Sequence, residues 1–197
     1  IAAREAAAKA SSISEKDAAL ISALEARYRQ NETGEVVEDA ETYADRMDIV
    51  SRRYGDDKLI LALAAEANMD TQPWDYWQTG ARTPKGRTAR TLELLDAALV
   101  IDPDFAPPIH LYIHATEASV DPFRAEAYAD RLHAQDLGIG HIVHMPSHIY
   151  LRLGRWKKAI QANIDAIAAD ASILKAIQHP DQPDTKKSYK PPHWDEI

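Results

Sequence analysis

The sequence predicts an all-α protein built from antiparallel helix pairs that stack one after another. Glycine is scarce, at 7 of 197 residues, and the β-branched runs bounded by turn residues that mark strands are nearly absent. Alanine-rich segments repeat their apolar residues at helical spacing instead. With 45% hydrophobic residues, the chain is long enough to bury the core of one domain or of one array of repeats.

Most predicted helices are bounded by a capping residue or a helix breaker. Ser14, with Asp17 three residues later, is typical of a helix start. Gly34 indicates a turn over residues 31–35, and Gly55 with Asp56 breaks a later helical stretch. The helices predicted in chain order span residues 1–10, 15–28, 38–54, 57–70, 88–101, 105–119, 122–133, 144–153 and 155–177.

A stretch rich in tryptophan and proline divides these helices into two sets. Residues 71–87 include Pro73, Trp74, Trp77 and Pro84, which predicts an ordered loop pinned by its aromatic side chains rather than a long helix. The chain starts without Met and ends without a finishing pattern, so we expect an internal piece of a longer protein. The predicted organisation is N-terminal helical hairpins over 1–70, this loop over 71–87, helix pairs over 88–177 and an extended segment over 178–197.

The composition of the chain excludes several classes of function. Lys and Arg total 23 against 31 Asp and Glu, a net charge of −8, whereas non-specific nucleic-acid binding needs a basic stripe. The sequence lacks the apolar run of about 18 residues that a membrane-spanning helix requires. The chain has no cysteine, so any metal must be held by His, Asp or Glu. Absence of cysteine fits a bacterial cytoplasm and a periplasm equally, so the compartment stays open.

Two adjacent segments resemble the tetratricopeptide-repeat (TPR) family. Gly154 and Ala159 match the glycine that ends the first helix of such a repeat and a small residue where the paired helices touch. Pro103 matches the proline that closes a repeat. Placing Gly154 at repeat position 15 gives two 34-residue repeats in register, 106–139 and 140–173. The resemblance implies a TPR-like α-solenoid, in which stacked helix pairs enclose a concave groove.

The repeat register places histidines at matched positions. His110 and His114 form a His-Xaa3-His pair, and His144 and His148 form a second pair 34 residues later. The pairs fall at repeat positions 5 and 9, which the resemblance implies line the groove. Side chains four residues apart on a helix have Cβ atoms about 5–6 Å apart, so two imidazoles can reach one cation.

A neighbouring helix lies about 8–10 Å away, which brings the second pair within reach of the first. The same register puts His141 at position 2 and Glu117 at position 12, both on the groove side. We therefore predict one metal centre on the concave face, with ligands drawn from His110, His114, His141, His144 and His148.

Glu117 is the predicted catalytic residue, either as an oxygen ligand or as a general base toward metal-bound water. Imidazole and carboxylate ligands without thiolate suit Zn, Fe, Cu, Mn or Ni, and the sequence does not choose among these divalent ions. Three further groove candidates each have a structural alternative: Tyr112 as a core residue, Arg152 as a solvated rim residue, and Glu66 as a solvent-facing carboxylate.

Two functions are compatible with this pattern. The first is a metal-binding repeat protein, either a metal-dependent enzyme of unknown substrate or a closed metal-binding module. The second is a non-catalytic scaffold whose groove grips a peptide or protein partner. A buried hydrogen-bond network that only specifies packing is a third explanation of the histidines.

The sequence has no nucleophile elbow, phosphate-binding glycine loop or dinucleotide fingerprint, so enzymatic activity stays open. The histidine segments, together with Pro73-Trp74-Asp75, resemble a group of bacterial TPR proteins. That resemblance implies a special role for the histidines and names no reaction.

Overall fold

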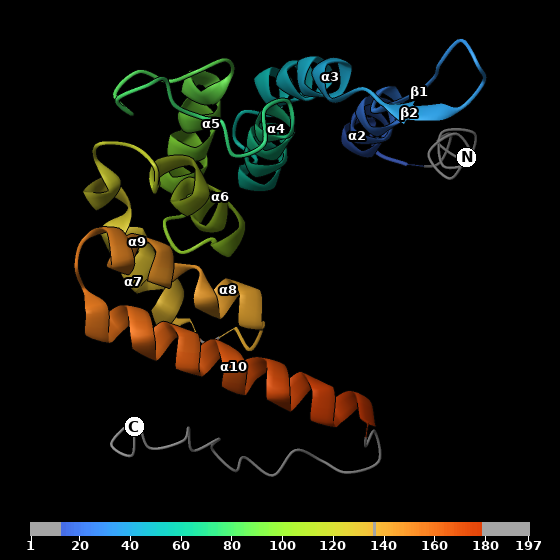
Figure 1. The fold of residues 1–197 in the computed structure, drawn as a ribbon. Helices are drawn as coiled ribbons and strands as arrows, with labels where there is room; N and C mark the ends of the chain where they lie inside the picture. The colour runs from blue at the N-terminus through green and yellow to red at the C-terminus, as the bar shows by residue number, and fades with distance from the viewer. Residues whose placement is uncertain (1–12, 136, 179–197) are drawn as a thin grey trace. The chain divides into compact units, whose positions relative to one another are not determined.

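The computed structural model describes residues 13–135 and 137–178 (Figure 1). Within them the chain is mostly helical, which confirms the predicted all-α class. The chain divides into two compact units, residues 1–120 and 121–197, and each is described by itself. The predicted helix over 1–10 and the extended segment after residue 178 lie outside the described residues.

Unit 1 is built from helices that pack against their neighbours in chain order. The contacts run from α2 to α3, α3 to α4, α4 to α5, and from both α4 and α5 to α6. Ser14 caps the first of these helices, because its hydroxyl accepts the backbone N–H of Asp17, as the sequence predicts. The helices are α2 (Glu15–Ala26), α3 (Ala40–Arg53), α4 (Lys58–Asp70), α5 (Thr88–Ile101) and α6 (Ala106–Thr116).

A short antiparallel hairpin follows α2, where the sequence analysis predicts helix and turn but no strand. Strands β1 (Tyr28–Gln30) and β2 (Val36–Glu38) pair around the predicted turn. The Asn31 side chain closes this turn by accepting the backbone N–H groups of Thr33 and Glu35. Both strands have three residues and are largely exposed, so they show no alternating apolar pattern that would predict them.

Asp57 caps the N-terminus of α4 and is the site of a first prediction. Its carboxylate accepts the backbone N–H groups of Leu59 and Ile60 and an ammonium N–H from Lys16. The hydrogen bond from Lys16 holds the pKa of this carboxyl below its usual value, and the two backbone N–H groups lower it further. Replacing Asp57 with alanine should therefore lower the free energy of unfolding by about 1 kcal/mol at neutral pH.

The effect of Asp57→Ala should shrink in acid. Because the pKa is lowered in the folded chain, the stabilisation is present above the usual aspartate pKa and is lost as the pH falls through the lowered one. Urea unfolding followed by helical circular dichroism at pH 7 and pH 3 measures this difference. Asp56→Ala removes the same charge from the adjacent exposed residue and is the control. Equal effects of the two substitutions would contradict the capping role.

The loop between α4 and α5 is held by the partly buried side-chain amide of Gln72. The Gln72 side chain fastens both ends of this segment, and Trp77 donates its indole N–H to the carbonyl of Ala115 in α6 at 2.8 Å. The Trp77 bond holds the tryptophan-rich loop of residues 71–87 against the helix that carries His110 and His114. The partners of the Gln72 amide are the carbonyls of Asp75 and Lys85, the Thr88 hydroxyl and the Arg87 N–H.

Unit 2 is organised around one long helix, α10 (Trp156–Gln178), which packs against α8 (Gly140–His144) and α9 (Pro146–Arg152) (Figure 1). The residues that α10 buries are Ala159, Ala162 and Ala166, whose small side chains permit a close approach of the helices. Helix α9 also contacts α7 (Glu126–Ala134) and the 3-10 turn η2 (Pro122–Ala125) that precedes α7.

None of the helices within residues 13–135 and 137–178 combines the length and the hydrophobicity that crossing a bilayer demands.

Candidate metal-binding site

The second histidine pair lies in unit 2, where its two rings meet edge to face. The Nε2 atoms of His144 and His148 are 3.0 Å apart, and the ring planes are nearly perpendicular, with centroids 4.8 Å apart. The pair is partly buried. Two nitrogens at this separation are close enough to share a proton or to bind one cation.

Pro146 shapes the backbone between these two histidines. It has no N–H to donate to the carbonyl four residues earlier, so the helix is interrupted between α8 and α9. The N–H of His148 bonds the carbonyl of Met145, three residues back, which is the tighter 3-10 spacing. Met145 keeps right-handed helical angles, so the chain continues in nearly the same direction through the interruption. The interruption is therefore a single tightened turn.

The far side of the His144 ring is held by polar groups from two elements. Its Nδ1 atom lies 2.8 Å from Oδ1 of Asn163 on α10 and 3.3 Å from the hydroxyl oxygen of Ser147 on α9. The Asn163 side chain is itself oriented, because its Nδ2 donates to the carbonyl of Ala159 at 2.8 Å. One nitrogen of His144 is thus occupied by this contact and the other faces His148.

The first histidine pair lies in unit 1, on α6. The rings of His110 and His114 are edge to face with centroids 4.9 Å apart, and a ring nitrogen of each lies within 4.8 Å of the other. His114 is 9% exposed. Glu117, the predicted catalytic residue, lies just after α6 with its Oε1 atom 3.6 Å from Nδ1 of His114. This carboxylate therefore stands beside a histidine nitrogen, where it can orient the ring.

Trp74, in the tryptophan-rich loop, contacts His114 of this pair. Its ring meets that of His114 edge to face, with centroids 5.0 Å apart, although the residue as a whole is 72% exposed. Trp74 also has a φ of +65°, a left-handed conformation that is uncommon for a bulky residue. Strained backbone of this kind persists only where the surrounding structure holds it, and it is frequent at functional sites.

Each pair is within one unit, so the predicted sharing of one ion by both pairs stays a prediction. His141, the fifth predicted ligand, is exposed on α8. The helix predicted over 144–153 leaves this residue out, whereas α8 begins at Gly140 and includes it.

The three groove candidates have different environments. Tyr112 is 3% exposed and continues the buried stripe of Ile109 and Ile113 on α6, which favours its structural alternative as a core residue; its groove role stays a prediction. Arg152 is exposed at the end of α9. Glu66 is exposed on α4, although packing around its carboxyl raises its pKa, as does the nearby charge of Asp70.

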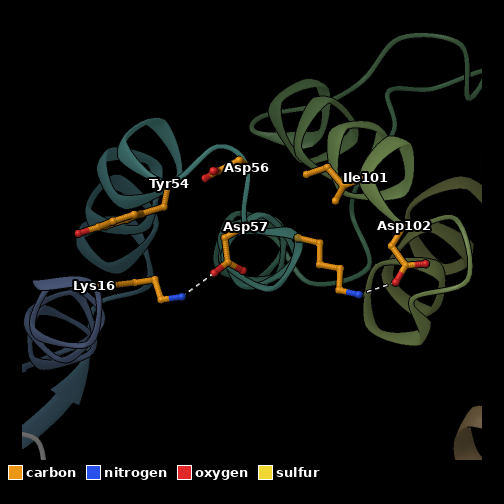
Figure 2. A pocket seen from close by; sticks show the side chains of 7 residues that line it. Lys16, Tyr54, Asp56, Asp57, Ile101 and Asp102 are labelled. Carbon is orange, nitrogen blue, oxygen red and sulfur yellow. Dashed lines mark hydrogen bonds and ion pairs between the residues drawn. The ribbon is translucent and has the colours of Figure 1, made fainter. Parts of the chain in front are cut away.

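A polar pocket of about 510 Å³ lies elsewhere in unit 1 (Figure 2). Both of its lysines are paired with carboxylates, Lys16 with Asp57 and Lys58 with Asp102. These pairs compensate most of its charge, and neither His110 nor His114 lines it. The lining residues are Lys16, Tyr54, Asp56, Asp57, Lys58, Ile101 and Asp102.

Asn163 is the residue that the sequence analysis missed. It follows Ala159 by four residues on the face of α10 that packs against the first helix of the predicted repeat. Pairing the helices over 144–153 and 155–177 in the predicted repeat places a polar residue on this face opposite the histidines. That is the signal by which it could have been found.

The chain matches no protein-family model, no curated protein and no solved structure. The function proposed below therefore rests on the geometry of the residues alone.

Proposed function

We propose that the chain binds a divalent transition-metal ion through its His-Xaa3-His pairs, with His144 and His148 as the best-oriented ligands. The observation that carries this proposal is the 3.0 Å separation of their Nε2 atoms. Two metal–nitrogen bonds of about 2.0–2.1 Å, at angles between square and tetrahedral, place their nitrogens about 2.9–3.4 Å apart. The separation of the two nitrogens therefore needs almost no change to bind one ion.

Two imidazoles fill only part of a coordination shell. The remaining positions would be taken by water or by other oxygen or nitrogen groups, as in metal sites that keep exchangeable ligands. Neutral imidazole suits Zn(II), Cu(II), Ni(II) and Fe(II), and somewhat less Mn(II). A water molecule on such an ion is more acidic than bulk water, so the same site supports a hydrolytic function.

The pair in unit 1 supports the proposal with a related arrangement. The Glu117 carboxylate lies 3.6 Å from Nδ1 of His114, and carboxylates beside metal-binding imidazoles commonly fix the ring and raise its basicity. In this role Glu117 acts on the ligand His114, in place of the direct catalytic role that the sequence analysis predicts for it.

We also propose that the stacked helices form a TPR-like solenoid. The order of contacts from α3 to α6 supports it, as does the short turn between α9 and α10, in which Gly154 has a φ of +69°. A scaffold function is the second candidate, because α10 exposes an apolar stripe at seven-residue spacing, formed by Ile160, Ile167 and Leu174.

Metal analysis of the purified full chain tests the first proposal. After purification without chelator and exposure to Zn(II), plasma mass spectrometry should find bound zinc in the wild type. His148→Ala should lower the zinc content by one ion per chain, because a single imidazole from the pair cannot hold it. His133→Ala removes a histidine outside the pairs and should leave the content unchanged. Wild-type zinc content in His148→Ala would contradict the proposal, and a wild type without metal would favour the scaffold.

A further inference from the structure

The contact between His144 and Asn163 defines where the proton of His144 lies. Asn163 donates its Nδ2 to the carbonyl of Ala159 at 2.8 Å, which turns its Oδ1 toward His144. A carboxamide oxygen has no hydrogen and can only accept. The 2.8 Å distance from this oxygen to Nδ1 of His144 therefore requires that Nδ1 carry the proton.

The tautomer of His144 in turn defines that of His148. In a neutral ring, a proton on Nδ1 leaves the lone pair on Nε2. This lone pair faces Nε2 of His148 at 3.0 Å, a normal hydrogen-bond length. In the neutral pair, the hydrogen between the two rings must therefore belong to His148, which donates its Nε2–H to His144.

We propose that Asn163 is a positioning residue that holds His144 in its Nδ1–H form, and that metal binding changes the tautomer of His148 alone. The inference rests on the proposed function, because it describes the same ligand pair. Each Nε2 lone pair forms one bond to the ion. His148 releases its Nε2 proton to solvent and takes one on Nδ1, so the neutral ring keeps its proton count. His144 needs no such change, because Asn163 already holds its proton on Nδ1.

The first pair also has an oxygen near the Nδ1 atom of one ring, at a distance of 3.6 Å that is longer than a hydrogen bond. In unit 1 the group beside Nδ1 of His114 is the Glu117 carboxylate, three residues further along the chain. In unit 2 it is the Asn163 amide from the neighbouring helix. Oxygen acceptors of this kind are the common partners of metal-binding imidazoles, and their loss typically costs about 10- to 100-fold in metal affinity.

Nitrogen NMR of the full chain, labelled with 15N-histidine, tests the inference. Long-range proton–nitrogen spectra distinguish the two tautomers, and His144→Gln and His148→Gln identify the resonances. Without metal, His144 should show the Nδ1–H pattern and His148 the Nε2–H pattern. On titration with Zn(II), His148 should convert to Nδ1–H while His144 stays unchanged.

Variants of Asn163 separate positioning from packing. Asn163→Ala should release His144 into a mixture of tautomers and weaken zinc binding about 10- to 100-fold. Asn163→Asp keeps an acceptor oxygen and should restore the Nδ1–H pattern. Gln161→Ala is the matched control, because it removes an exposed amide on the same helix that donates to Asp165. It should change neither the tautomer of His144 nor the zinc affinity.

The outcomes distinguish this inference from the proposed function. An Nε2–H pattern for His144 in the metal-free wild type overturns the inference. Zinc binding that is equally tight in the wild type and in Asn163→Ala overturns the role of Asn163 and leaves the proposed function intact. A wild type that binds no zinc overturns the proposed function and the change at His148, while the role of Asn163 is still decided by the metal-free spectra.

Discussion

Replacing Ile149 with alanine should lower the free energy of unfolding of unit 2 by about 2–5 kcal/mol. Ile149 is 0% exposed and lies on α9 directly after His148. Truncation removes buried methyl and methylene groups and leaves a cavity in the contact that α9 makes with its neighbours. A helix as short as Pro146–Arg152 depends on such packing, because isolated short helices are marginal in water. Because His148 lies on the same helix, zinc binding by His148 should also weaken in Ile149→Ala.

Ile160→Ala provides the matched control for this substitution. It removes the same atoms from α10, where the residue is 56% exposed, and should change the stability by less than about 0.5 kcal/mol. Urea unfolding followed by circular dichroism compares the two variants. Similar losses in both would show that Ile149 does not anchor α9 through its burial.

Substituting Gly86 with alanine should destabilise unit 1 by about 2–4 kcal/mol. Gly86 has a φ of +51°, and a Cβ atom there would lie 1.7 Å from Oε1 of Gln72. The substitution therefore combines the cost of a left-handed backbone with displacement of the amide that fastens the tryptophan-rich loop. Because this loop places Trp74 against His114, the fluorescence emission of Trp74 should shift as well.

Gly80→Ala isolates the backbone cost from the collision. Gly80 belongs to the same loop and has a φ of +88°, but a Cβ atom there meets nothing within 4 Å. We expect a loss of about 1–2 kcal/mol and an unchanged emission of Trp74. An equal loss of stability and an equal spectral shift in both variants would contradict the fastening role of Gln72.

The sequence predicts the helices well because their boundaries are local. Ser14 caps α2 by the predicted contact with Asp17, and α5 spans the predicted 88–101. The hairpin is not predicted because it depends on the Asn31 side chain in the turn and on a hydrogen bond from Arg27 to Glu38 across its base. Three-residue exposed strands leave no periodic pattern in the sequence.

The candidate site is predictable only in part, for a similar reason. The spacing of His144 and His148 on one helix face is visible in the sequence, and the structure brings their rings together. The partner that orients His144 comes from a residue 19 positions away, which only the packing of α8 and α9 on α10 identifies. The left-handed backbone of Trp74 has no sequence signature, because bulky residues rarely adopt it.

If the second pair binds an ion as proposed, the interruption at Pro146 also bears on which ion it would select. In a continuous helix, backbone hydrogen bonds at every turn hold two side chains that are four residues apart at a constant separation. Here the tightened turn at Met145 replaces one of those backbone bonds. The distance between the two ring nitrogens can therefore change by the few tenths of an ångström that distinguish ions of different radius. We expect a tolerant pair that follows the general first-row order, copper above zinc. Cellular supply, more than ligand geometry, would then determine its occupant.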